Sequence, residues 1–180
     1  MRITKQMLVR RWAICGIAAI AVFAVLLALD LQLKAASGVG TADLQSYSSA
    51  AEYRMAFWSW RRASFAVRAG FDLGLDYLLM PLYAAAFFYS GILAREAFAP
   101  RPGRLRRLLT TLAAVPIAGA LLDAGENALQ LFMILAGATD ALASLSATLS
   151  HAKWAALAVG AALALGAVMG QLKKPAKTGP

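Results

Sequence analysis

Apolar residues are concentrated in four long runs, at about 12–33, 70–94, 108–136 and 147–172. A helix rises about 1.5 Å per residue and the hydrocarbon layer of a bilayer is about 30 Å thick, so each run is long enough to cross a membrane. Because lipid offers the backbone no hydrogen bonds, a crossing segment must be an α-helix. The pattern therefore predicts an all-α integral membrane protein, a four-transmembrane-helix bundle that forms a single membrane domain over residues 1–180.

The loop between the first two runs contains a segment with a different pattern, at about residues 50–66, which includes AEYRMAFWSWRRASF. Its aromatic residues and arginines fall on neighbouring stripes at helical spacing. Tryptophan and tyrosine favour the headgroup level of a bilayer, and arginine reaches lipid phosphates from there. We expect an interfacial helix in the first outside loop, serving either as an anchor or as a lid. The residues expected at this interface are Tyr53, Trp58, Trp60, Arg61 and Arg62.

The third run contains four strongly polar residues, Asp123, Glu126, Asn127 and Gln130. Their spacing of i, i+3, i+4 and i+7 places all four on one face of a helix. An aspartate at the centre of a membrane-spanning helix costs about 2.5–3.5 kcal/mol even on the lower scales. We therefore expect this face to point into the bundle or towards water, and not towards lipid.

Polar residues in the other runs match this face. Asp72, Asp76 and Tyr83 share a stripe of the second run, and His151 and Lys153 lie near the start of the fourth. Counted inward at about 1.5 Å per residue, Asp76, Lys153, Gln130 and Glu126 fall in one layer in the outer half of the membrane. The inner half of every run is nearly free of ionisable residues. This asymmetry predicts a polar pocket that opens outward and is closed below by apolar side chains.

A blind pocket favours binding or chemistry over transport, because a permeating ion needs polar groups along both halves of its path. With Asp30 at the end of the first run, up to five carboxylates would face Lys153. We interpret the pocket as a site for a lipid-like or small amphipathic molecule, bound or subjected to acid–base chemistry. The candidate catalytic residues are Glu126, Asp76 and Asp123. The candidate substrate-binding residues are Asn127, Lys153, His151, Tyr83, Asp72 and Gln130.

A structural role is the alternative. Lys153 could simply neutralise a carboxylate, with Asn127 and Gln130 as hydrogen-bonding glue between helices, in a structural or accessory subunit of a membrane complex. We expect no metal site, because His151 is the only histidine and the chain lacks the Glu-x-x-His pairs of di-metal bundles. The sequence does not identify a cofactor, and its single cysteine allows no disulfide framework.

Composition and charge agree with a membrane location. The chain is 61% hydrophobic, above the usual 45–50% or so of soluble domains, and has a net charge of +9. The basic residues flank the apolar runs, which indicates membrane lipids as partners and not nucleic acid. Twelve of them lie in the N-terminal tail, the loop between the second and third runs and the C-terminal tail, against five on the other side. The positive-inside rule then predicts a multi-pass protein of the bacterial inner membrane with both termini cytoplasmic and a short flexible tail at 173–180. Assembly into a homo-oligomer or a larger membrane complex stays open.

Two short motifs carry a resemblance. They are D-x-x-x-D-Y with a following proline (Asp72, Asp76, Tyr77, Pro81) and D-x-x-E-N (Asp123, Glu126, Asn127), joined to Lys153 at the entrance of the last run. In these motifs the chain resembles small four-span bacterial membrane proteins of uncharacterised function. The resemblance implies a four-helix membrane bundle in which these positions matter, and it implies no activity.

Overall fold

The computed structural model describes residues 4–172, which form helices joined by short loops and contain no strand. The long helices are α1 (Lys5–Ser37), α3 (Ala66–Phe98), α4 (Arg104–Ala136) and α5 (Asp140–Leu172), and the α1–α3 connection carries the 3-10 helix η1 (Ala42–Ser46) and helix α2 (Ala50–Arg62). The four long helices are each long and apolar enough to cross a membrane, which confirms the prediction of a multi-pass helical protein. Each extends beyond the apolar run that predicted it, and the predicted tail at 173–180 lies outside the described residues.

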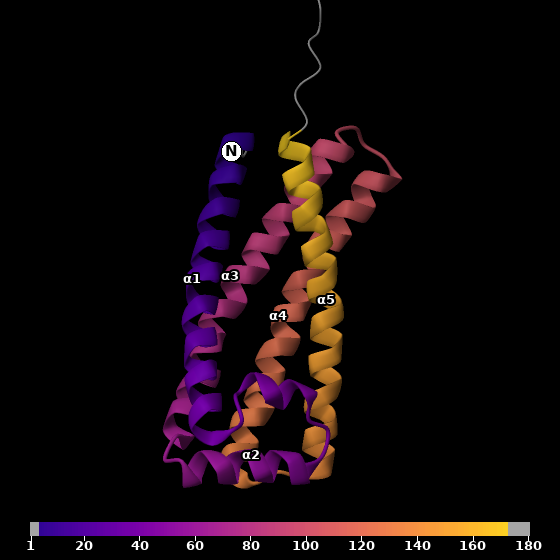
Figure 1. Ribbon diagram of the computed structural model, residues 1–180. Helices are drawn as coiled ribbons and strands as arrows, with labels where there is room; N and C mark the ends of the chain where they lie inside the picture. The colour runs from indigo at the N-terminus through magenta and orange to yellow at the C-terminus, as the bar shows by residue number, and fades with distance from the viewer. Residues whose placement is uncertain (1–3, 173–180) are drawn as a thin grey trace, which may run out of the picture.

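Local sequence signals set the turns of the α1–α3 connection. α1 ends at Gly38, whose φ of 83° is a left-handed conformation that glycine adopts without steric cost. α2 begins with a capping box, in which the Ser49 hydroxyl accepts a hydrogen bond from the Glu52 N–H and the Glu52 carboxylate accepts one from the Ser49 N–H. The chain therefore leaves α1 and turns across the end of the bundle before it enters α3 (Figure 1).

Helices α3, α4 and α5 pack closely on one another. A Cβ atom added at Gly91 of α3 would lie 2.5 Å from the Cβ of Ala113 of α4, so glycine permits this approach. The G-x-x-x-G pair of α5 has the same use, because an added Cβ at Gly170 would lie 2.5 Å from the Cβ of Ala97 in α3. Gly91 and the pair Gly166 and Gly170 thus make their close contacts inside the bundle.

Helix α1 is attached differently from the other three. It packs mainly on α3. In the most apolar stretch of α1, 0% of the residues are buried, compared with 44% in the most apolar stretch of α3. Figure 1 shows α1 standing apart from α5, at the opposite side of the bundle. α1 therefore lies along one side of the molecule and does not join α3, α4 and α5 in a common four-helix core.

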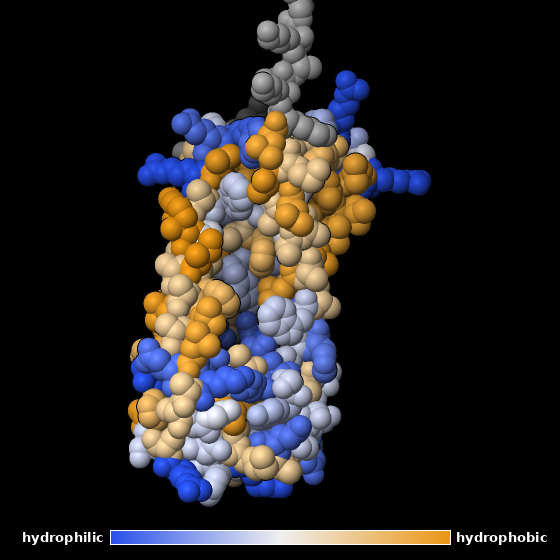
Figure 2. Space-filling model, viewed as in Figure 1, coloured by the Kyte–Doolittle hydropathy of each residue, from blue (hydrophilic) through white to orange (hydrophobic). Residues whose placement is uncertain are grey.

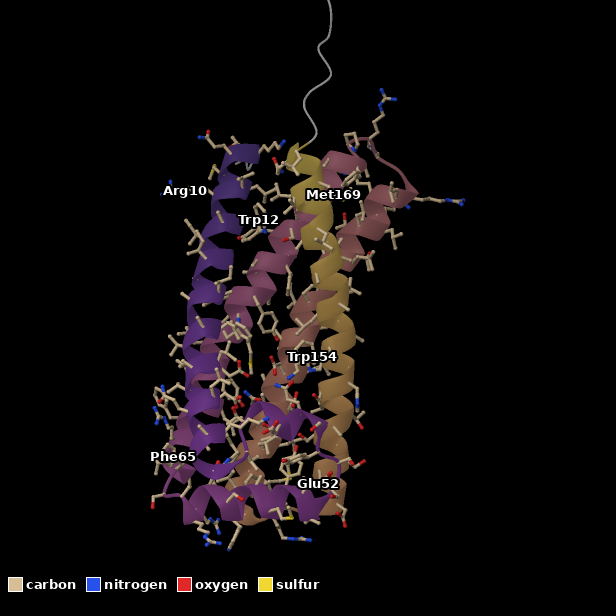
Figure 3. All side chains as sticks on the ribbon, in the orientation of Figure 1. Arg10, Trp12, Glu52, Phe65, Trp154 and Met169 are labelled. Carbon is tan, nitrogen blue, oxygen red and sulfur yellow. The ribbon has the colours of Figure 1, made fainter. Side chains whose placement is uncertain are left out.

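The two ends of the bundle have separate apolar clusters. At the end covered by α2, buried residues include Leu33, Leu44, Tyr53 and Trp60. At the opposite end, near the first described residues, Leu8 of α1 packs with apolar residues of α3 and α5. Trp12 and Met169 lie near this second end, whereas Glu52 and Phe65 lie near the α2 end (Figure 3). We call these the N-terminal end and the α2 end.

The five interface residues predicted in the first loop divide between two faces of α2. Tyr53 and Trp60 are buried against the bundle, and the Trp60 indole N–H donates to the Val39 carbonyl over 2.8 Å. Trp58, Arg61 and Arg62 are exposed on the outer face, where the Arg62 guanidinium lies 5.1 Å from the centre of the Trp58 ring. α2 is thus an amphipathic cover on the end of the bundle.

Candidate functional site

A cavity of about 560 Å³ lies between α1 and α5, and its floor is formed by α3 and α4. In the space-filling view the molecule is hollowed along this line, with apolar surface on either side and polar atoms in the depth (Figure 2). The cavity therefore opens at the side of the bundle, at the level of the membrane-spanning segments. The polar groups lining it are Asp30, Thr41, Gln45, Asp72, Asp76, Tyr83, Asp123, Asn127, Gln130 and Lys153.

The walls of the cavity are apolar where it opens. α1 contributes Ile20 and Phe23, both largely exposed, and α5 contributes Leu157. Trp154 of α5 also lines it and lies about midway along the helix (Figure 3). An apolar opening above a polar floor is the arrangement that suits a molecule with a hydrocarbon part and a polar part.

The floor of the cavity contains a buried ion-pair network between α4 and α5, which we call the ion-pair layer and which consists of Asp123, Glu126, Gln130 and Lys153. The Lys153 ammonium group donates to Asp123 Oδ1 over 2.9 Å and lies 2.6 Å from Glu126 Oε2. The second contact falls outside hydrogen-bond geometry, so it is an ion pair only. The Gln130 amide donates to the other Glu126 oxygen over 3.0 Å. Lys153 and Glu126 are 2% and 0% exposed, so these two side chains are almost completely withdrawn from solvent.

Hydrogen bonds made by Tyr83 and Asn127 tie α3 to the polar face of α4. The Tyr83 hydroxyl donates to Asp123 Oδ2 over 2.9 Å, which completes the coordination of that carboxylate. The Asn127 amide donates to Asp76 Oδ2 over 2.8 Å and to the Leu73 carbonyl over 3.3 Å. Asp76 is half-buried and has this one donor among the described residues, so its second oxygen is free at the cavity wall.

A second polar group lies where α1, η1 and α3 meet, and its two acids, Asp30 and Asp72, are called here the carboxylate pair. The Thr41 hydroxyl lies 3.0 Å from Asp30 Oδ1 and also contacts Asp72 Oδ2. Asp30 Oδ1 also accepts from the Ala42 N–H over 3.0 Å. Asp72 is 3% exposed, and its Oδ1 atom has no hydrogen-bond partner. A hydroxyl group has one hydrogen, so Thr41 donates to only one of the two acids at a time.

η1 covers the α2 end of the cavity. It is held to α1 by the Lys34 ammonium group, which donates to Asp43 over 2.7 Å, and to α5 by the Trp154 indole N–H, which donates to Gln45 over 3.0 Å. Sequence reasoning missed Thr41 and Gln45, because a short polar loop segment has no periodicity to show where it folds back. It also missed Trp154, although this residue directly follows Lys153 in the fourth apolar run.

The predicted site residues separate into three groups in the structure. The first group lines the cavity and consists of Asp72, Asp76, Tyr83, Asp123, Asn127, Gln130 and Lys153. Glu126, a candidate catalytic residue, does not line it and is buried behind Lys153. His151, a candidate substrate-binding residue, is exposed on the surface of α5 and does not line the cavity either. Residues two apart on a helix point in nearly opposite directions, so His151 cannot share the face of Lys153.

Among residues 4–172 no group of three or more histidine, cysteine, aspartate or glutamate side chains is arranged to hold a metal ion. Comparison of the chain with family models, with curated proteins and with solved structures finds no match. The fold and the site define a multi-pass helical membrane protein with a cavity that opens at its side and has a carboxylate-rich floor. Its function must therefore be argued from this cavity.

Proposed function

We propose that the protein binds an amphipathic, lipid-like molecule in the cavity between α1 and α5. The observation that carries the proposal is the division of the cavity into an apolar opening and a polar floor. Its volume of about 560 Å³ falls within the range of about 300–1,000 Å³ typical of sites for small molecules. A hydrocarbon chain could leave the cavity between Phe23 and Leu157 and remain in contact with lipid.

The one-sided attachment of α1, which packs on α3 and hardly on α4 or α5, supports a path from the membrane. The helices of the α3–α4–α5 group hold one another, whereas α1 rests mainly on α3. Movement of α1 would widen the cavity without breaking the ion-pair layer, since no residue of α1 takes part in it. A membrane-soluble ligand would then enter sideways.

If the bound molecule undergoes acid–base chemistry, Asp76 is the residue we propose as acid or base. It lines the cavity with a free carboxylate oxygen, whereas Glu126 is fully buried behind Lys153. Asp123 is satisfied by Lys153 and Tyr83. Glu126 then serves to position Lys153, and Asn127 to orient Asp76.

The location in the membrane is part of the proposal. We place α2 at the outer surface of a bacterial inner membrane, with Trp58 and Arg62 at the headgroups and both ends of the chain in the cytoplasm. The exposure of Trp58, at 59%, and the outward arginines support this placement. Cys15 is the only cysteine, so labelling of single cysteines introduced at Ser48 and Gly103 in a Cys15→Ala background tests the orientation. Impermeant reagents added to intact cells should label the first and spare the second.

The ion-pair layer favours a second candidate function, that of a structural or accessory subunit. Its charges are paired with one another, and such polar contacts join helices in membrane proteins without any ligand. This candidate leaves the cavity beside the layer unexplained. It predicts that nothing specific is bound there.

Native mass spectrometry of the purified protein, followed by extraction of bound lipid, tests the proposal. Ala19 lines the cavity, so Ala19→Trp should fill part of it. Ala21, two residues further along α1, is exposed and does not line the cavity, so Ala21→Trp is a matched control. We expect a defined bound mass in the parent and in Ala21→Trp and its loss from Ala19→Trp. Equal, non-specific lipid on all three folded proteins would favour the structural role.

A further inference from the structure

The charges around the cavity do not balance. Four carboxylates line it, those of Asp30, Asp72, Asp76 and Asp123, and Lys153 is the one basic side chain among the lining residues. That ammonium group is already shared between Asp123 and the buried Glu126. Arg68 does not line the cavity and donates instead to Gln32. Among the described residues, none of Asp30, Asp72 and Asp76 forms an ion pair with a basic side chain.

Hydrogen-bond acceptors are also in excess at this end. Asp72 Oδ1 is buried without a partner, and Asp76 accepts at only one of its two oxygens. Thr41 offers a single hydrogen to the two acids of the carboxylate pair. A buried carboxylate oxygen without a donor is costly, so the site lacks donors and positive charge together.

We propose that the bound molecule carries a protonated primary amine, and that its ammonium group binds between Asp72 and Asp76 with its hydrocarbon chain along α1 and α5. This rests on the proposed function and names the chemical class of its ligand. The two aspartates are four residues apart on α3 and therefore lie on the same face of the helix. A primary ammonium group has three N–H donors, enough to supply both oxygens that have no donor, Asp72 Oδ1 and the second oxygen of Asp76.

Other polar groups fit the site less well. A quaternary ammonium group has the right charge but donates no hydrogen bond, so Asp72 Oδ1 would stay without a donor. A carboxylate or phosphate group would meet Asp72 and Asp76 with like charge, while Lys153 is held by two acids. An alcohol donates one hydrogen bond and brings no charge. The expected order of binding is therefore primary amine first and anion last.

A series of probes with one common chain tests this order. Binding of dodecylamine, dodecyltrimethylammonium, dodecanol and dodecanoate to the detergent-purified full chain is measured by displacement titration. Each value is taken as the difference between Ala21→Trp and Ala19→Trp, which removes partition into detergent. We expect dodecylamine to bind at least about tenfold more tightly than dodecanol, because hydrogen bonds to charged groups are worth more than neutral ones. Lysophosphatidylethanolamine is a fifth probe, an amine that also carries a phosphate group. Whichever of the two amines binds more tightly shows whether the ligand is a phospholipid or a simple alkyl amine.

Two isosteric variants locate the ammonium group. Asp72→Asn and Asp76→Asn should each reduce the advantage of dodecylamine over dodecanol about tenfold and leave dodecanol unchanged. Glu96→Gln is the control, because Glu96 has the same charge but pairs with Arg95 and Arg106 away from the cavity. The probe order in the parent tests the proposal even if one variant fails to fold.

The outcomes separate this inference from the proposed function. If dodecanol or the quaternary ammonium probe binds as tightly as dodecylamine and is blocked by Ala19→Trp, the cavity binds amphiphiles but the amine class is wrong. Tightest binding of dodecanoate would overturn the inference in the same way. If Ala19→Trp affects none of the probes and no bound mass is retained, both the inference and the proposed function fail.

Discussion

The ion-pair layer and the carboxylate pair are two acidic groups beside the same cavity with opposite degrees of completion. In the ion-pair layer, Lys153 lies between Asp123 and Glu126, and each carboxylate has a further donor on its other oxygen. Glu126 Oε2 and Asp72 Oδ1 are both buried without a hydrogen-bond donor in the described residues, but Glu126 Oε2 lies 2.6 Å from a cation, whereas Asp72 forms no ion pair there. A network whose charges are paired holds helices together by itself, whereas buried acids without a cation are stable only if something else neutralises them. We therefore assign a structural role to the first and ligand binding to the second.

The largest effect expected from this difference follows loss of Lys153. Lys153→Met removes the one cation from the ion-pair layer and leaves two buried carboxylates facing each other. Breaking a buried ion pair by removing one partner costs about 3–5 kcal/mol, so the free energy of unfolding should fall by about that amount. Unfolding in mixed micelles with increasing denaturing detergent measures it. A loss of under about 1 kcal/mol would show that the layer is not structural.

A combined variant checks the cause of this loss. In Asp123→Asn/Glu126→Gln/Lys153→Met all charges of the layer are removed together. Replacing a whole buried ion pair by neutral groups of similar size is often close to neutral, so this variant should recover most of the stability lost in Lys153→Met. Without such recovery, the loss would come from packing around Lys153 and not from unpaired charge.

A smaller effect is expected from widening the contact between α3 and α4. Gly91→Ala places a Cβ atom 2.5 Å from that of Ala113, close to the backbone, and should lower the free energy of unfolding by about 1–3 kcal/mol. Gly74→Ala in the same helix is a matched control, because an added Cβ there meets nothing within 4 Å. The control should be neutral or slightly stabilising, since alanine favours helix over glycine. Equal effects of the two would show that the close approach of α3 and α4 at Gly91 does not contribute to stability.

Asp72→Asn should have the smallest effect on stability among the changes to the cavity. Asp72 contributes an incomplete set of hydrogen bonds, so its replacement by a neutral amide should change the free energy of unfolding by under about 1 kcal/mol or increase it. The same unfolding assay measures this change in the absence of added ligand. A loss as large as that of Lys153→Met would remove the distinction between the two acidic groups.

The sequence was sufficient for what depends on periodicity. The four apolar runs predicted the four long helices, and the spacing of Asp123, Glu126, Asn127 and Gln130 predicted one face, on which all four are buried. Helical periodicity also shows that His151, two residues from Lys153, points away from the face of Lys153, so its prediction as a substrate-binding residue was avoidable. It could not show that Glu126 lies behind Lys153 and away from the cavity, because that depends on how far α4 and α5 approach.

The path of the α1–α3 connection was the main feature that the sequence did not reveal. Thr41 reaches Asp72 across 31 positions of the chain, and Trp154 reaches Gln45 across 109. Such contacts follow from tertiary packing, and no local pattern encodes them. The sequence therefore predicted the acids of the carboxylate pair but not the hydroxyl group that joins them.

The last prediction concerns pH and the segment that supplies Thr41. η1 is fixed by Asp43, which accepts from the Lys34 ammonium group over 2.7 Å and from the Gly40 N–H over 2.9 Å. Burial raises the pKa of Asp43, but these two hydrogen bonds and the positive charge of Lys34 together more than offset it, so the pKa lies below the ordinary value of 3.8. A lowered pKa contributes stability that is present above pH 3.8 and is lost as the pH falls through the folded value. Hydrogen exchange of the amides at 40–46, corrected for intrinsic rates, should therefore show protection that declines only below that pH.

Asp43→Asn separates this contribution from that of the carboxylate pair, which also contacts η1 through Thr41 and the Ala42 N–H. In this variant, protection at 40–46 should already be reduced at neutral pH and should change less on acidification than in the parent. Identical pH profiles in parent and variant would show that Asp43 does not cause the pH dependence of the protection.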